Sequence, residues 1–156
     1  EMGQNMILLT GIIWSIYHYT QETHLHRPSY WLFAASFFLL LFGREISWGR
    51  VFLLKEMTET GPVFWSMKDL PYHRVIGLLS AAVIHLFYQS VNVQKTLHCL
   101  KKNRLMFLLT VLAAILALMG DKGQLFHDFR DETMEELSEL FVYLQIFFFI
   151  HRYRIA

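Results

Sequence analysis

Long apolar runs alternate with short polar segments along this chain. Five runs contain no lysine or arginine, and the only acidic residue within them is Glu139. They cover residues 6–20, 30–43, 75–93, 105–120 and 137–150. Only the third reaches the length of about 20 residues that a membrane-spanning helix usually needs. Tyrosine, tryptophan and arginine stand near the ends of the shorter runs, where they favour the membrane interface. The pattern predicts an all-α, single-domain integral membrane bundle of about five transmembrane helices.

The segments around the second run carry two further expectations. We expect the second helix to continue through residues 44–54, because this stretch remains largely apolar. Residues 50–74 are too many for a tight turn and contain a Gly-Pro pair followed by aromatic residues. This segment is therefore expected to form a partly structured loop at the membrane surface.

The composition favours lipid over water as the surroundings of the chain. Of the 156 residues, 54% are hydrophobic and 17% are charged, whereas about 25% are charged in ordinary soluble domains. A soluble protein with buried helices is the alternative, but five apolar runs leave little polar surface to cover them. With 14 basic and 13 acidic residues, the chain lacks the positive excess of nucleic-acid-binding proteins. A single cysteine, Cys99, excludes an internal disulfide framework.

The loop charges predict an orientation. Basic residues divide evenly between the two sides that five spans would create, so their number alone does not decide. The cluster Lys101-Lys102-Asn103-Arg104 directly abuts the fourth run, and short basic loops favour the cytoplasm. We therefore expect an integral membrane protein with its N-terminus outside and its C-terminus in the cytoplasm. Its expected partners are membrane lipids, with another membrane protein or a second copy of the chain as alternatives, and no nucleic acid.

Small and polar residues recur at helical spacing within the runs, and such residues favour contacts between helices in lipid. The first run carries Gly11, Ser15 and His18 in this way. The third carries a longer stripe, formed by Gly77, Ala81, His85, Gln89 and Asn92. The spacing predicts a polar seam inside the bundle that contains His18, His85, Gln89 and Asn92. Histidine inside a span is a functional candidate. Hydrogen bonding of neutral His85 to another helix is favoured over haem ligation by His18 and His85.

Acidic residues gather on the predicted non-cytoplasmic side. The expected binding site there contains Glu45, Trp48, Asp121, Glu135, Glu136 and Glu139. A carboxylate at an apolar helix end raises the free energy of the folded protein unless it shares a proton, a metal or an arginine with its neighbours. We expect Glu45 to lie close to residues 135–139, with Arg44 or Arg130 as the partner. The alternative is that these acids only cap the last helix, because Thr133 and Glu136 fit a capping box.

A divalent metal is the alternative occupant of this acidic side. His73, His127 and Asp128 could add imidazole and carboxylate ligands to the cluster. No compact pair of histidines supports this reading on that side. We therefore expect no cofactor, and we keep a divalent metal as the open alternative.

The string Glu45-Ile46-Ser47-Trp48-Gly49-Arg50 follows the second run. It resembles a Glu-Ile-Ser-Trp-Gly-Gln-Arg-like motif of small uncharacterised polytopic bacterial membrane proteins. In those proteins an acid at the end of a later span and a Glu-rich start to the next span also recur. The resemblance implies a multi-helix protein of a bacterial inner membrane and groups Glu45 and Trp48 with Asp121, Glu136 and Glu139. The chain departs from the motif at Arg44 and Arg50, and the resemblance implies no activity.

Three functions remain open from the sequence. The favoured one is a non-enzymatic binding or assembly module for a lipid headgroup, an ion or a membrane-protein partner. The second is a membrane-embedded, metal-dependent lipid hydrolase that uses the acidic side. The third is an oligomeric channel or transporter that conducts along His85, Gln89 and Asn92. The sequence contains no Gly-rich phosphate loop and no Gly-x-Ser-x-Gly elbow, which favours the first function.

Overall fold

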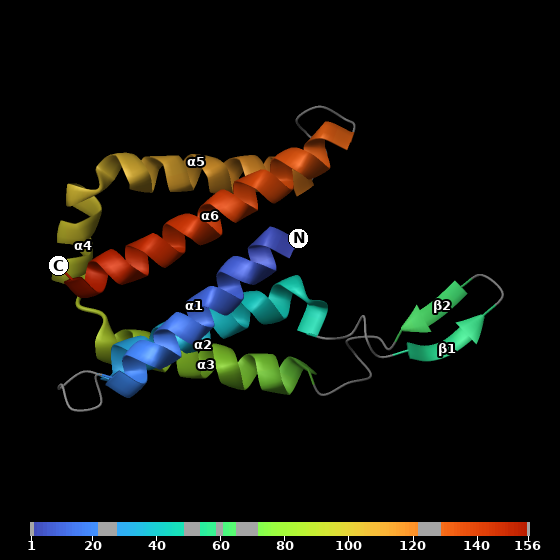
Figure 1. The fold of residues 1–156 in the computed structure, drawn as a ribbon, viewed down its shortest axis with the longest axis horizontal. Coiled ribbons are helices and arrows are strands. Elements are labelled where there is room, and N and C mark those ends of the chain that lie inside the picture. The colour runs from blue at the N-terminus through green and yellow to red at the C-terminus, as the bar shows by residue number, and fades with distance from the viewer. Residues whose placement is uncertain are drawn as a thin grey trace. The chain divides into compact units, whose positions relative to one another are not determined.

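The computed structural model describes residues 2–21, 28–48, 54–58, 61–64, 72–121 and 129–155. These residues form six helices and one β-hairpin (Figure 1). The elements are α1 (Met2–Gln21), α2 (Pro28–Glu45), β1 (Leu54–Thr58), β2 (Gly61–Phe64), α3 (Tyr72–Ser90), α4 (Val93–Lys102), α5 (Arg104–Asp121) and α6 (Phe129–Ile155).

The predicted all-α fold is confirmed, since each of the five apolar runs forms most of one helix. One local expectation is wrong, because helix α2 ends at Glu45 instead of continuing. Within the expected partly structured loop, the described residues form the antiparallel β1–β2 hairpin. Gly61 adopts a φ of 127° in this hairpin, a conformation that glycine reaches without a steric penalty.

The third run is interrupted within its predicted bounds. Helix α3 ends at Ser90, and Asn92 starts α4 as its N-cap. The Asn92 side chain accepts hydrogen bonds from the backbone N–H groups of Gln94 and Lys95, at 2.9 and 3.3 Å. Asparagine is favoured at the N-cap position because its side chain can accept such hydrogen bonds. Asn92 therefore lies outside the third helix.

Among the described residues, no single helix is both long enough and apolar enough to cross a membrane. The interrupted pair His73–Ser90 and Val93–Lys102 meets the same measure when the two helices are taken together, by length and composition only.

The contacts divide the chain into two units, which are described separately. One unit contains Leu8–Ser90, and the other contains Glu1–Ile7 with Val91–Ala156. In the Leu8–Ser90 unit, α1 packs on α2 through small residues. A Cβ at Gly11 would lie 2.9 Å from the ring of Phe38, a side chain that is only 1% exposed. The Ser15 hydroxyl donates to the Gly11 carbonyl at 2.7 Å, so it needs no partner outside the helix.

In the other unit, α5 and α6 pack side by side (Figure 1). They run antiparallel, because Arg152 near the end of α6 bonds to Asn103, just before α5. Ala113 and Ala117 are buried on α5, and Ser138 is buried on α6. Small residues allow such helices to approach closely without a large apolar core.

Candidate functional site

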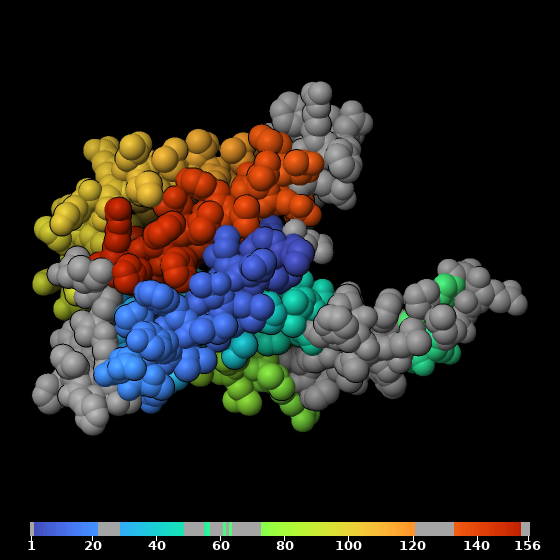
Figure 2. All heavy atoms as spheres, in the orientation of Figure 1, coloured from blue at the N-terminus to red at the C-terminus, as the bar shows by residue number. Residues whose placement is uncertain are grey.

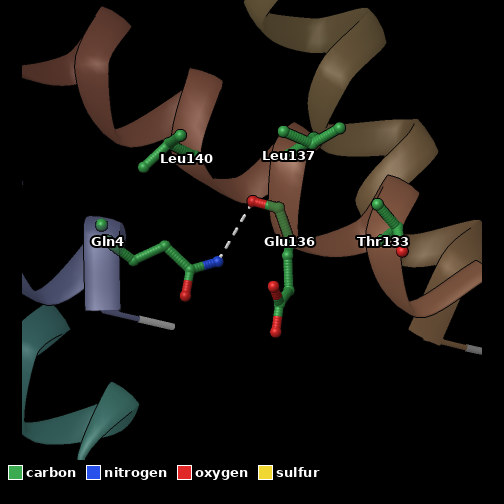
Figure 3. A pocket seen from close by; sticks show the side chains of 6 residues that line it. Gln4, Thr133, Glu136, Leu137 and Leu140 are labelled. Atoms are coloured by element: carbon green, nitrogen blue, oxygen red, sulfur yellow. Dashed lines mark hydrogen bonds between the residues drawn. The ribbon is translucent and has the colours of Figure 1, made fainter.

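The first turn of α1 meets the beginning of α6 through one buried glutamine. The Gln4 side chain is 2% exposed, and its amide nitrogen makes two hydrogen bonds. It donates to the Glu136 carbonyl at 3.2 Å and to a carboxylate oxygen of Glu139 at 3.1 Å. Figure 3 shows the Gln4 side chain reaching across to the α6 backbone. The amide thus supplies a donor to a half-buried acid that sits inside an apolar helix.

Local sequence explains why these groups meet. Gly3 has no side chain, and a Cβ there would lie 3.2 Å from a methyl of Leu140. The first turn of α1 can therefore lie close against α6. Glu136 and Glu139 are three residues apart on α6, so they share one helix face toward which Gln4 reaches.

A shallow hollow of about 190 Å³ lies at this meeting point. Its lining consists of Gly3, Gln4, Thr133, Glu136, Leu137 and Leu140. Glu136 is exposed. Its backbone carbonyl accepts the hydrogen bond from Gln4, and its side chain points away from that carbonyl (Figure 3). Carboxylate oxygens accept hydrogen bonds and carry negative charge. The hollow therefore suits a ligand group that donates hydrogen bonds or carries a positive charge.

Glu135, Glu136 and Glu139 are predicted from the sequence, whereas Gln4 is not. The available signal was weak, since Gln4 and Asn5 are polar residues just before the first apolar run. The contact joins residues 132 and 135 positions apart in the chain, which local patterns do not reveal.

Glu45 and Trp48 lie at the end of α2, in the other unit. Ser47 and Trp48 have φ values of 48° and 54°, in the left-handed region. The chain thereby turns back, and a Cβ at Gly43 would lie 2.7 Å from the Trp48 ring. The Glu-Ile-Ser-Trp string thus terminates a helix. The expected proximity of Glu45 to residues 135–139 joins the two units and stays a prediction.

The two histidines of the predicted seam have different surroundings within the Leu8–Ser90 unit. His18 is half-buried and stacks on Trp31, with ring centroids 4.6 Å apart. His85 is exposed, and its Nε2 lies 2.9 Å from the Gln89 amide nitrogen of the same helix. The expected hydrogen bond from His85 to another helix is therefore replaced by one within α3.

The whole polar stripe of α3 departs from the expected seam. Gly77, Ala81, His85 and Gln89 are all exposed, whereas Val83 and Ser90 are buried. Phe87 makes an edge contact with Phe33 of α2, at a centroid distance of 5.6 Å. The packing face of α3 is therefore aromatic and aliphatic, because large side chains bury more apolar area than a Gly and Ala stripe.

The proposed metal ligands are only partly described. His73 is exposed in the first turn of α3. His127, Asp128 and the side chain of Asp121 lie outside the described residues. Among the residues whose positions are described, no three potential ligands come together.

Comparison with known proteins gives no match to a family model, a curated protein or a solved structure. The resemblance of residues 45–50 to polytopic bacterial membrane proteins therefore stays a prediction.

Replacing Gln4 tests the energetic role of the site. Gln4→Leu is expected to lower the free energy of unfolding by about 1–3 kcal/mol, because Glu139 and the Glu136 carbonyl lose a buried donor. Adding Glu139→Leu should recover part of this loss, since the acceptor is removed together with its donor. Thermal unfolding of the purified variants in mild detergent measures both effects. Strictly additive losses would show that Gln4 and Glu139 do not interact.

Proposed function

We propose that this chain is a small helical membrane protein that acts as a non-enzymatic binding module. Its acidic hollow, formed by the start of α6 and the first turn of α1, would receive a cationic group. The observation that carries this proposal is the α5–α6 pair, which has an apolar middle and charged ends of opposite sign.

The middle of α5 supports lipid as its surroundings. Residues 105–120 contain no charged side chain and extend over about 24 Å as a helix. Apolar side chains are exposed along its whole length, among them Leu105 at 70%, Leu112 at 54% and Leu118 at 63%. Figure 2 shows atoms of α5, in yellow to orange, on the surface of the molecule. The polar Thr110 donates its hydroxyl to the Met106 carbonyl at 2.8 Å. Exposed apolar area on this scale is unfavourable in water but favourable in a bilayer.

The ends of the pair carry the charges. Lys101, Lys102 and Arg104 stand at one end, and Glu135 and Glu136 stand near the other. Glu139 lies about one turn further into α6. The uncharged stretch of α5 is shorter than the hydrocarbon core of a bilayer, which is about 30 Å thick. Local thinning of the bilayer and snorkelling of the basic side chains can accommodate this difference.

The acidic end supports binding of a positive group. Glu136 is an exposed acidic residue at this end, and the Glu139 carboxylate accepts a hydrogen bond from Gln4. A lipid amine or a basic side chain of a membrane-protein partner would provide the matching charge. Binding requires only these acceptors, whereas hydrolysis would require a metal or a nucleophile beside them.

Chemical coupling in native membranes tests this assignment. A water-soluble carbodiimide activates exposed carboxylates, and an amine held beside Glu136 should then form an amide with it. We expect mass spectrometry of the digested protein to find this adduct on the Glu136 peptide and to lose it in Glu136→Gln. The mass of the adduct distinguishes phosphatidylethanolamine from a partner's lysine.

Glu56 provides the matched control, because it is an exposed carboxylate on the β1 strand. Glu56→Gln should leave the Glu136 adduct unchanged. Equal amounts of amine on Glu56 and Glu136 would mean that the coupling reports exposure alone, and the binding assignment would be wrong.

A further inference from the structure

Helix α4 is anchored to the end of α6 by Asn92. The Asn92 backbone N–H donates to the Tyr153 hydroxyl at 2.8 Å, while the Asn92 side chain caps α4. Tyr153 is 6% exposed, and the Lys95 ammonium lies 5.0 Å from its ring centroid. This distance is within the range of a cation–π contact. The beginning of α4 is therefore held in place by neutral groups and an aromatic ring.

The other end of α4 is anchored by Asn103. Its side-chain nitrogen donates to the Cys99 carbonyl at 2.9 Å, and its side-chain oxygen accepts from Arg152 at 2.7 Å. Cys99 itself is buried, at 2% exposure. The structure thus fixes the orientation of α4 and brings Arg152 of α6 beside the basic segment that joins α4 to α5.

Four exposed basic residues gather around Asn103, and we name them the basic junction: Lys101, Lys102, Arg104 and Arg152. Residues 91–120 and 140–156 contain no aspartate or glutamate. No neighbour along these two stretches therefore neutralises the junction. Like charges held together in this way favour a negatively charged partner.

Exposed apolar side chains accompany these charges on α4. Val93 is 68% exposed and Leu97, one turn later, is 52% exposed. Leu105, at the start of α5, is also exposed, at 70%. A helix that presents basic and apolar residues together is typical of segments lying in the plane of a membrane interface.

We propose that the basic junction binds the headgroups of anionic phospholipids, with α4 lying in the interface. This inference rests on the membrane assignment proposed above. The four cations match the negative charge of an anionic leaflet, and Val93 and Leu97 would contact the acyl boundary beside it. A free phosphate would satisfy the charges but would leave these apolar side chains in water. Arg152 is held by Asn103, so its guanidinium is already positioned for a phosphate.

Lipid binding to the purified full chain tests the proposal. Native mass spectrometry in detergent micelles would count phosphatidylglycerol and phosphatidylcholine molecules bound from an equimolar mixture. We expect a preference for phosphatidylglycerol in the unmodified chain. The triple substitution Lys101→Gln, Lys102→Gln and Arg104→Gln should weaken phosphatidylglycerol binding on the order of a hundredfold.

A second triple substitution serves as the matched control. Arg44, Lys55 and Arg74 are exposed basic residues of the Leu8–Ser90 unit. Their combined replacement by glutamine removes the same charge and should leave the preference unchanged. An equal loss in both triples would mean that only net charge matters and would overturn the proposal, as would an unmodified chain without any preference.

Two further measurements separate the alternatives. If inorganic phosphate displaces phosphatidylglycerol while chloride at equal ionic strength does not, the junction is a site for a free anion and the lipid assignment is wrong. Alkaline carbonate washing of native membranes tests the membrane assignment independently. A chain that washes off but still prefers phosphatidylglycerol would refute the integral membrane proposal and retain the lipid-binding junction.

Discussion

Gly11→Leu is expected to disrupt the packing of α1 on α2 and to lower the free energy of unfolding by about 3 kcal/mol. Even the first carbon of a side chain would lie 2.9 Å from three ring atoms of Phe38. Phe38 is 1% exposed and Ala34, one turn earlier, is fully buried, so the ring has little space to move. Thermal unfolding in mild detergent, followed by tryptophan fluorescence, measures the loss.

Gly77 provides a control with the same chemical change. It is an exposed glycine within α3, and a Cβ there would meet no atom within 4 Å. Gly77→Leu should leave stability unchanged or raise it by about 1 kcal/mol, because leucine is the better helix former. Similar losses at both positions would show that glycine replacement weakens either helix for reasons unrelated to Phe38.

The helices could be predicted because their signal is local. A run without charges that contains many large apolar residues can satisfy its backbone groups as a helix wherever it is buried. The five runs therefore correspond to helices. Their ends were harder to place, because a helix end depends on a few capping groups. At the end of α2, Ser47 and Trp48 turn back in the left-handed region, a change that hydropathy does not reveal.

The break between α3 and α4 shows how one residue permits two interpretations. Asn92 continued a polar stripe with His85 and Gln89, which favoured a long third helix. Its side chain instead accepts hydrogen bonds from two backbone N–H groups at the start of α4. Asparagine is a preferred N-cap residue, so the sequence also permits the interpretation that Asn92 begins a new helix. The short basic helix α4 was not predicted, because its residues do not form an apolar run of their own.

Only part of the acidic site could be predicted. The charge pattern identified Glu136 and Glu139, since acids at the beginning of an apolar helix stand out. Gln4 was not predicted, because its role depends on a contact between residues 132 positions apart in the chain. Small residues also proved ambiguous, since Gly11 lies against a neighbouring helix whereas Gly77 is exposed. A stripe of small residues shows which faces could pack but not which of them do.

Leu112→Asp is expected to prevent α5 from crossing the membrane in most molecules. Leu112 lies midway between the charged ends of the α5–α6 pair and is 54% exposed. An aspartate at the centre of a spanning helix raises the free energy of insertion by about 2.5–3.5 kcal/mol. In water the same change at an exposed position would be nearly neutral. The substitution therefore distinguishes a lipid-facing helix from a water-facing one.

The measurement uses single cysteines in a Cys99→Ser background. Met134→Cys and Lys102→Cys place one thiol near each end of the pair, and both positions are exposed. A membrane-impermeant maleimide should reach residue 134 from outside the cell and residue 102 only after permeabilisation. With Leu112→Asp, both thiols should be reached from the same side in most molecules. Labelling from one side in the parent chain would already exclude a crossing by α5.

Leu105→Asp is the control for depth. Leu105 is more exposed than Leu112, at 70%, but it follows Arg104 directly at the beginning of the helix. A charge at the interface costs little, and an acid in the first turn is favourable to the helix dipole. Leu105→Asp should therefore preserve labelling from opposite sides. If both aspartates had the same effect, depth along α5 would not matter, and the bilayer would not be the surrounding of this helix.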